Sequence, residues 1–392
     1  MLDIWGGHSK LKVIRWFLFW LAFAALVYFL YFWRLGSLTP GLSSAEVVNR
    51  QAVSSVHHIL TNPLNAPHQL LQHYLSQGHG FFYLRLASVL LGLIFLVCYF
   101  MLCRWWFGKN LAYLTTLMLA STPWVVLTAR GANADIMFLS PLAVLAAYYW
   151  LTRTKRKSLA WLSLCLSIAL AVYTPGVLWF VLLGLILARN QLAKVFKSLP
   201  PASIALGIIV LLVSLYPLTS AIVTTPSTGR SLLLIPASWP GLKEILKATS
   251  WNLLALFWQT RQHLDFSLGQ LPMLNAAQTI LAIFGSYAMA TRARRQAWAL
   301  GALIVVSIIA AGLNENTKMM ALAIPSLAIL VGAGLRYLYV EWRSVFPRNP
   351  VPHFLAWSLV ILLVGLHLIL SLRYSLIAWP HNPITHHTYM LQ

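Results

Sequence analysis

Acidic side chains are so scarce in this chain that each one is a candidate for chemistry. The 392 residues include seven aspartates and glutamates against 28 lysines and arginines. A carboxylate at membrane level costs free energy and is usually kept for a function, such as accepting a proton in catalysis. Glu46 stands out first, because it follows the first apolar segment and has no lysine or arginine within three residues.

The composition predicts a protein with many membrane spans. Hydrophobic residues make up 59% of the chain and charged residues 9%, and the mean hydropathy is +0.74. A surface this apolar does not suit a soluble globule. The net charge of +21 comes from short basic clusters between apolar runs, which favours lipid headgroups and membrane topology over nucleic acid as their explanation.

Apolar runs that can cross about 30 Å of hydrocarbon predict an all-α fold. The region 158–188 is ambiguous, because Tyr173-Thr174-Pro175-Gly176 interrupts it and either one kinked helix or two short helices would fit. Two helices place six basic clusters on one side, which the positive-inside rule makes cytoplasmic. We therefore expect eleven spans: nine near 16–33, 84–103, 111–127, 136–151, 201–217, 272–290, 298–312, 319–340 and 354–376, and two short ones within 158–188.

This topology predicts that the N-terminus lies on the cytoplasmic side of the membrane and the C-terminus on the outer side. We expect a single transmembrane domain, 1–392, and no C-terminal soluble domain. The chain has no glycosylation sequon, which favours a prokaryotic plasma (inner) membrane. Two long outer loops, about 34–83 and 218–271, are expected to carry interfacial helices, and apolar residues at helical spacing within 242–257 predict one of them. Five acids fall outside, so chemistry would face outward: Glu46, Asp135, Glu244, Asp265 and Glu315.

Several short motifs follow one another along the predicted outer face. They are Glu46; Pro63 and Asn65-Ala66-Pro67; Arg85-Leu86-Ala87-Ser88; Thr128 to Asp135; Tyr173 to Gly176; and Lys318 with Ala323-Ile324-Pro325 and Gly334-Leu335. Their order and spacing resemble the membrane glycosyltransferases of the GT-C fold, in the branch of protein mannosyltransferases and bacterial aminoarabinose (lipid A) transferases. The resemblance covers most of the chain.

The resemblance implies an inverting transfer of one sugar from a polyprenyl phosphate to a hydroxyl of a lipid, glycan or protein, without a cofactor. Such a reaction needs a carboxylate for the acceptor proton and a cation for the leaving phosphate. Relatives supply the carboxylate from an Asp-Glu pair, but the matching residues here are Ala45 and Glu46. Either Glu46 is the base, or Asp135 or Glu315 takes that role, or the enzyme is impaired.

The remaining site residues also follow from the resemblance. Asp135 would orient the acceptor or assist the base, and Lys318 and Arg130 would bind the donor phosphate. Simpler alternatives are an Arg130–Asp135 ion pair and a Lys318 side chain that snorkels to the membrane interface. Arg85 and Glu315 would belong to the substrate loop, with Arg85 more a loop-tethering residue than a ligand.

Other functional classes fit the sequence less well. The histidines of the first outer loop match no standard zinc spacing, and acids are scarce, so we expect no metal site. A lipid or sugar transporter or flippase would carry ionisable residues near mid-membrane and related halves, and neither is visible here. A catalytically silent GT-C member that binds lipid-linked sugar stays open because of Ala45.

Overall fold

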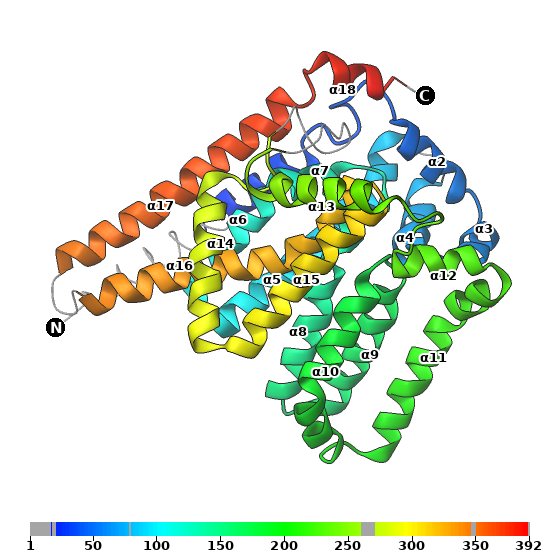
Figure 1. The fold of residues 1–392 in the computed structure, drawn as a ribbon, viewed down its shortest axis with the longest axis horizontal. Helices are drawn as coiled ribbons and strands as arrows, with labels where there is room; N and C mark the ends of the chain where they lie inside the picture. Colours follow the sequence, from blue (N-terminus) through cyan, green and yellow to red (C-terminus); the bar gives the residue numbers. More distant parts are fainter. Residues whose placement is uncertain (1–16, 18–20, 78–79, 260–270, 346–349, 391–392) are drawn as a thin grey trace, which may run out of the picture.

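The computed structural model describes residues 17, 21–77, 80–259, 271–345 and 350–390, and every element of regular structure in these ranges is a helix (Figure 1). Seven helices of the described chain are long and apolar enough to cross a membrane, or eight if the bent pair α6 and α7 forms one span. Two shorter apolar helices, Leu21–Phe32 and α9, add to these. The expected all-α membrane architecture is therefore confirmed, while the count of eleven spans stays a prediction.

The long helices form the body of the molecule. In chain order they are α5 (Phe81–Phe107), α6 (Lys109–Ser121), α8 (Ser140–Arg153), α9 (Lys157–Val172), α10 (Val177–Phe196), α11 (Pro201–Thr224), α14 (Ala276–Arg292), α15 (Arg294–Leu313), α16 (Ile324–Val345) and α17 (Pro350–Leu372). Short π-helical turns, η1 (Tyr28–Phe32) and η4 (Arg373–Ala378), end the first apolar helix and extend α17.

The region that the sequence left ambiguous folds as two helices. Between α9 and α10, Gly176 has a φ of +79°, a left-handed conformation that glycine adopts without steric cost. Lys157, at the start of α9, donates a hydrogen bond to the Ser198 hydroxyl, just after α10, over 2.8 Å. The start of α9 and the end of α10 are therefore close together, so the chain reverses at the break. The two helices are thus antiparallel.

The predicted span 111–127 is bent in the structure. Helices α6 and α7 (Pro123–Arg130) meet at an angle of 61°. Proline has no amide hydrogen and disfavours a helical conformation in the residue before it. Thr122 accordingly has a ψ of 127°, and the bend directs α7 towards the loop that carries Asp135.

Short helices gather at one end of the molecule, along the upper right edge in Figure 1. The segment 34–83 contains α2 (Ser44–Ala52), α3 (Val56–Thr61) and α4 (Ala66–Ser76). The segment 218–271 contains α12 (Pro226–Leu233) and α13 (Leu242–Phe257), and α18 (Pro383–Thr388) lies near the C-terminus. Two 3-10 helices, η2 (Ala134–Leu139) and η3 (Thr317–Ala323), lead into α8 and α16.

Candidate functional site

Glu46 lies at the start of α2 and is buried, with 1% of its surface exposed. Ser43 caps the helix by accepting from the Glu46 amide, and the Glu46 carboxylate accepts in return from the Ser43 amide. This reciprocal pair is a capping box. The remaining hydrogen bonds of the carboxylate reach much further along the chain, to Arg85 in α5 and to the amide of Ala132.

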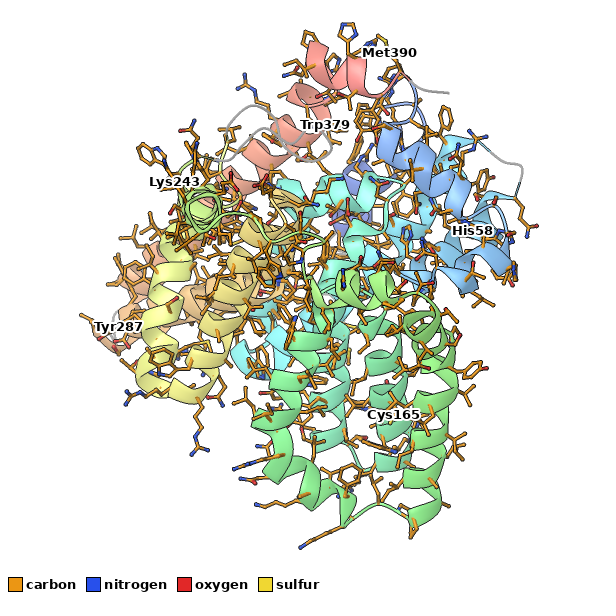
Figure 2. The ribbon with its side chains drawn as sticks, turned by 45° about the vertical axis from the view of Figure 1, so that its right-hand side comes forward. His58, Cys165, Lys243, Tyr287, Trp379 and Met390 are labelled. Atoms are coloured by element: carbon orange, nitrogen blue, oxygen red, sulfur yellow. The ribbon has the colours of Figure 1, made fainter. Side chains whose placement is uncertain are left out.

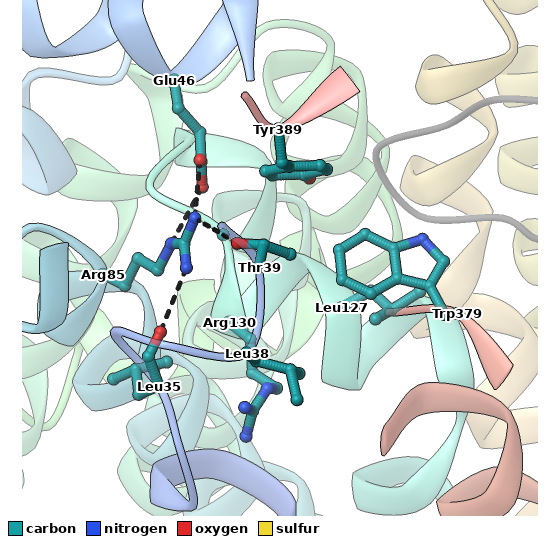
Figure 3. A pocket seen from close by; sticks show the side chains of 10 residues that line it. Leu35, Leu38, Thr39, Glu46, Arg85, Leu127, Arg130, Trp379 and Tyr389 are labelled. Carbon is teal, nitrogen blue, oxygen red and sulfur yellow. Dashed lines mark hydrogen bonds and ion pairs between the residues drawn. The ribbon is translucent and has the colours of Figure 1, made fainter. Parts of the chain in front are cut away.

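The Glu46–Arg85 ion pair ties three segments together (Figure 3). Arg85 donates to both carboxylate oxygens, from Nε over 3.2 Å and from Nη2 over 2.9 Å. Its other hydrogen bonds go to the Leu35 and Gly41 carbonyls and to the Thr39 hydroxyl. A buried ion pair is stable only when its remaining hydrogen-bonding groups are satisfied, and here both partners meet that condition.

This geometry makes Glu46 a tether. Its carboxylate accepts from Arg85, from Ser43 N and from Ala132 N at 2.7 Å, so these groups occupy both oxygens. A general base needs a free lone pair within reach of the acceptor proton. The side chain instead links the start of α2 to α5 and to the turn between α7 and η2.

Arg130 lines the same pocket as Glu46 and Arg85 but forms different contacts (Figure 3). Its guanidinium is buried and donates to the carbonyls of Leu30 at 3.0 Å and Trp33 at 2.7 Å. In the described part of the chain, the structure therefore does not form the Arg130–Asp135 ion pair that the sequence allowed. The arginine satisfies carbonyls that the end of the first helix leaves without intrahelical partners.

A set of buried and half-buried polar side chains holds the turn just before Asp135. The carbonyl of Ala132 accepts from Asn49 at 2.6 Å and from Gln72 at 2.9 Å. The carbonyl of Asn133 accepts from Ser88 at 3.2 Å. Together with the Glu46 contact to the Ala132 amide, these bonds fix the backbone of residues 132 and 133 from α2, α4 and α5. We call this group the turn clamp; its side chains are Glu46, Asn49, Gln72 and Ser88.

His68 supports the turn clamp from α4. Its Nε2 lies 2.8 Å from the Ser88 hydroxyl. Because that hydroxyl donates to Asn133, His68 is the donor in this contact. The ring is fully buried, and burial lowers its pKa to about 4. Sequence reasoning missed this histidine and the amides, because nothing in their local spacing marks them; their partners are up to 83 residues away.

Asp135 and Lys318 come together although 183 positions separate them in sequence. Asp135 is in the first turn of η2 and Lys318 in the first turn of η3, and these two short helices pack against each other. Lys318 Nζ lies 3.8 Å from Asp135 Oδ2, with 19% and 24% of the side chains exposed. A carboxylate and an ammonium group thus lie side by side, and both are partly exposed at the protein surface.

Glu315 lies in the loop before η3 and is exposed. It adopts a left-handed backbone conformation with a φ of 47°, which is uncommon for residues other than glycine. Asn316, the next residue, caps η3 by accepting from the Lys318 amide at 3.0 Å. Within the described residues, no three His, Cys, Asp or Glu side chains are grouped so that they could hold a metal ion.

Solved structures with a similar fold share this architecture across nearly the whole chain. The structure of ArnT from Cupriavidus metallidurans in the apo state aligns with a TM-score of 0.62 and 17% identity, over 96% of this chain and 78% of that one. The chain has the GT-C fold. The same protein bound to undecaprenyl phosphate aligns with a TM-score of 0.54 and 16% identity, over 96% and 76% of the two chains.

Two further comparisons agree with the GT-C fold. AglB from Archaeoglobus fulgidus, an archaeal oligosaccharyltransferase solved with an inhibitory peptide and a dolichol-phosphate, aligns with a TM-score of 0.51 and 11% identity, over 90% of this chain and 56% of that one. The family model for dolichyl-phosphate-mannose-protein mannosyltransferases matches residues 69–217. No match was found among curated protein sequences. On the GT-C fold of this chain, residues 69–217 span α4 to α11 and include both the turn clamp residue Gln72 and Asp135.

Proposed function

We propose that this protein transfers a sugar from a polyprenyl-phosphate donor to an acceptor hydroxyl, with inversion, on the outer side of the membrane. The observation that carries the proposal is the Asp135–Lys318 pair, which joins η2 to η3 and is partly exposed. The reaction requires a carboxylate and a cation close together. The family model and the two lipid-phosphate-bound neighbours support a polyprenyl phosphate as the donor.

In the proposed reaction, the acceptor oxygen attacks the anomeric carbon of the sugar while the bond from that carbon to the phosphate oxygen breaks. The acceptor proton passes to the Asp135 carboxylate, and the polyprenyl phosphate leaves with one additional negative charge. Lys318 stabilises that charge as it develops. At 3.8 Å the two side chains lie beyond normal hydrogen-bonding distance of each other, so donor binding can draw the ammonium towards the phosphate.

Glu46 has a positioning role in this proposal. It holds the Ala132 amide three residues before Asp135, and Asn49, Gln72 and Ser88 hold the adjoining carbonyls. A base must be held within a fraction of an ångström of its working position. Relatives have an aspartate where this chain has Ala45. In this proposal Asp135, from the next outer turn, acts as the base instead.

The test uses purified full-length protein in nanodiscs. Binding of undecaprenyl phosphate gives a Kd, and incubation of undecaprenyl-phosphate sugars with a lipid and glycan extract gives a rate, measured as undecaprenyl phosphate released. Asp135→Asn should lower that rate by about 100-fold or more without changing the Kd. Lys318→Met should weaken binding by about 10- to 100-fold, because a lost charge-assisted contact is worth ~1.5–3 kcal/mol.

Matched controls come from the opposite end of the molecule. Glu341→Gln removes a carboxylate from an exposed ion pair with Arg292, and Lys194→Met removes an ammonium at the end of α10; neither should change the rate or the Kd. If Asp135→Asn releases the lipid phosphate as fast as wild type, Asp135 is not the base. Binding without release would favour a silent member, and lipid movement across the bilayer without bond cleavage would favour a flippase.

A further inference from the structure

Two exposed arginines from different helices each contact one of two consecutive tryptophans at the end of α5. Arg153, in the last turn of α8, has its Cζ 5.8 Å from the ring centre of Trp105 and 5.9 Å from that of Tyr149. Arg336, in α16, donates to the backbone carbonyl of Trp106. Both arginines are exposed, so the guanidinium groups are anchored on protein while facing outward.

The aromatic rings beneath the arginines pack on one another. Trp105 stacks on Tyr149 with ring centres 6.4 Å apart, and Trp106 meets Tyr149 edge-on at 4.9 Å. Tryptophan and tyrosine concentrate at the level of lipid headgroups, where one side of the ring is apolar and the other is hydrated. We call these five residues the double-arginine cluster: Trp105, Trp106, Tyr149, Arg153 and Arg336.

Carboxylates do not neutralise the double-arginine cluster within the described chain. The ion pairs formed there are Glu46–Arg85, Asp135–Lys318 and Glu341–Arg292. Glu341 belongs to the same end of the molecule as the cluster, but it is 2.7 Å from Arg292. Both exposed arginines thus carry positive charge that no carboxylate of the described residues balances. A guanidinium group matches phosphate oxygens in bidentate geometry.

An exposed apolar stripe runs along α5 from the double-arginine cluster towards the middle of the helix. Ile94, Val97 and Met101 follow one another at intervals of three and four residues and have 52%, 59% and 39% of their surfaces exposed. Residues at this spacing lie on one face of a helix. A ligand that fits both features has a phosphate at one end and extended hydrocarbon at the other.

We propose that the double-arginine cluster binds an anionic glycerophospholipid. The headgroup phosphate lies between Arg153 and Arg336, and an acyl chain lies along the stripe on α5. Basic pockets between transmembrane helices select anionic lipid headgroups in this way, because a zwitterionic lipid brings its own cation to the site. The site includes neither Asp135 nor Lys318 and does not depend on the proposed sugar transfer.

The experiment measures the thermal midpoint of the purified full-length protein in mild detergent. Phosphatidylglycerol should raise the midpoint by several degrees, because a ligand that binds the folded state stabilises it. Phosphatidylcholine and inorganic phosphate should not. The double variant Arg153→Gln/Arg336→Gln should lose most of that rise. The matched control Arg156→Gln/Arg189→Gln removes two exposed positive charges that do not belong to the double-arginine cluster, and it should keep the rise.

Each variant is compared with its own midpoint in phosphatidylcholine, so a general loss of stability is not mistaken for lost binding. Arg153→Lys/Arg336→Lys keeps the charge without the bidentate fork and should show an intermediate rise. The proposal is overturned if both Gln double variants lose the rise equally, which would indicate diffuse attraction to charge. It is also overturned if inorganic phosphate stabilises the protein as well as phosphatidylglycerol does.

Discussion

The buried Glu46–Arg85 ion pair predicts how substitutions at Glu46 change the stability of the protein. Glu46→Gln removes the carboxylate and leaves the buried Arg85 guanidinium without a counter-charge. We expect a loss of about 3–5 kcal/mol of folding free energy. The double variant Glu46→Gln/Arg85→Met should recover part of it, because no unpaired charge is then buried. Thermal unfolding of the purified variants measures both effects.

The two roles of Glu46 predict different results in the same preparation. If Glu46 is a tether, Glu46→Gln lowers stability and turnover together, and conditions under which the variant folds also restore its turnover. If Glu46 is instead the base, the Glu46→Gln protein would fold normally, bind undecaprenyl phosphate normally and fail to transfer sugar. A stable, donor-binding and inactive Glu46→Gln protein would therefore contradict the tethering assignment.

His68 predicts a pH dependence of stability that can be assigned to one residue. Burial lowers the pKa of His68 to about 4, whereas an exposed histidine has a pKa near 6.5. Between these values the unfolded chain binds a proton that the folded chain does not. The contribution of His68 to stability is therefore complete above about pH 6.5 and is lost as the pH falls towards 4.

The variant His68→Gln tests this assignment. Glutamine places an amide NH₂ where His68 Nε2 donates to Ser88, and it does not titrate. The thermal midpoint of the wild type should fall more steeply between pH 6.5 and 4 than that of the variant, with the two curves parallel above pH 7. Equal slopes throughout the range would show that another group controls the acid response.

Residue roles were predicted from the sequence only in part, and the reason is physical. The scarcity of acids drew attention to Glu46 and Asp135, but a sequence does not show what a side chain contacts. Glu46 meets Arg85 after 39 residues and Ala132 after 86, and those contacts give it a tethering geometry. Its isolation in sequence therefore coexists with close pairing in space.

At the scale of elements, α14 and α16 pack closely enough that glycine is required at their contact. A Cβ on Gly285 would lie 1.8 Å from the Leu330 carbonyl oxygen, and one on Gly334 would lie 1.9 Å from that of Leu281. Small residues allow such close approach between helices in membranes. Gly285→Ala should push the helices apart and cost about 1–3 kcal/mol.

Gly301 in α15 is the matched control, because a Cβ there meets nothing within 4 Å. Gly301→Ala should be neutral or stabilising by up to about 1 kcal/mol, since alanine favours a helix more than glycine does. In thermal unfolding, Gly285→Ala should therefore lower the midpoint, whereas Gly301→Ala should raise it or leave it unchanged. Similar losses in both would mean that the contact between α14 and α16 adapts without strain.

Element positions were more predictable than their shapes. Hydropathy located the long helices, and the Pro175-Gly176 signal located the break between α9 and α10. The bend at Pro123 carried a signal of its own, since proline restricts the residue before it. The 3-10 turns of η2 and η3 carried none. They place Asp135 and Lys318 side by side through packing between parts of the chain that are far apart in sequence.

At the scale of the whole molecule, contacts connect the basic clusters across one end. Arg292 pairs with Glu341 and lies over the ring of Tyr337. The neighbouring Arg336 reaches the end of α5, where Arg153 lies over Trp105. Lys157, just after α8, bonds to Ser198 after α10. A continuous series of contacts thus joins clusters that the sequence assigned to one side by counting spans.

This shared end predicts a testable orientation in the membrane. By the positive-inside rule the basic end should face the cytoplasm, and α13 with the other short helices should face outward. In a variant with Cys98, Cys103 and Cys165 replaced by serine or alanine, Gln296→Cys would report on the turn region at the start of α15, and Lys243→Cys on α13. Both positions are exposed, and Figure 2 labels Lys243 on α13.

A membrane-impermeant maleimide applied to intact spheroplasts should label Lys243→Cys at once and Gln296→Cys only after permeabilisation. Two further cysteines, Ser250→Cys on α13 and Arg156→Cys before α9, are exposed and should behave like the first and second positions respectively. Labelling of both Gln296→Cys and Arg156→Cys from outside would reverse the orientation and move the Asp135–Lys318 pair to the cytoplasmic side. That outcome would contradict sugar transfer on the outer face, while the binding of anionic lipid by the double-arginine cluster would still be open to its own test.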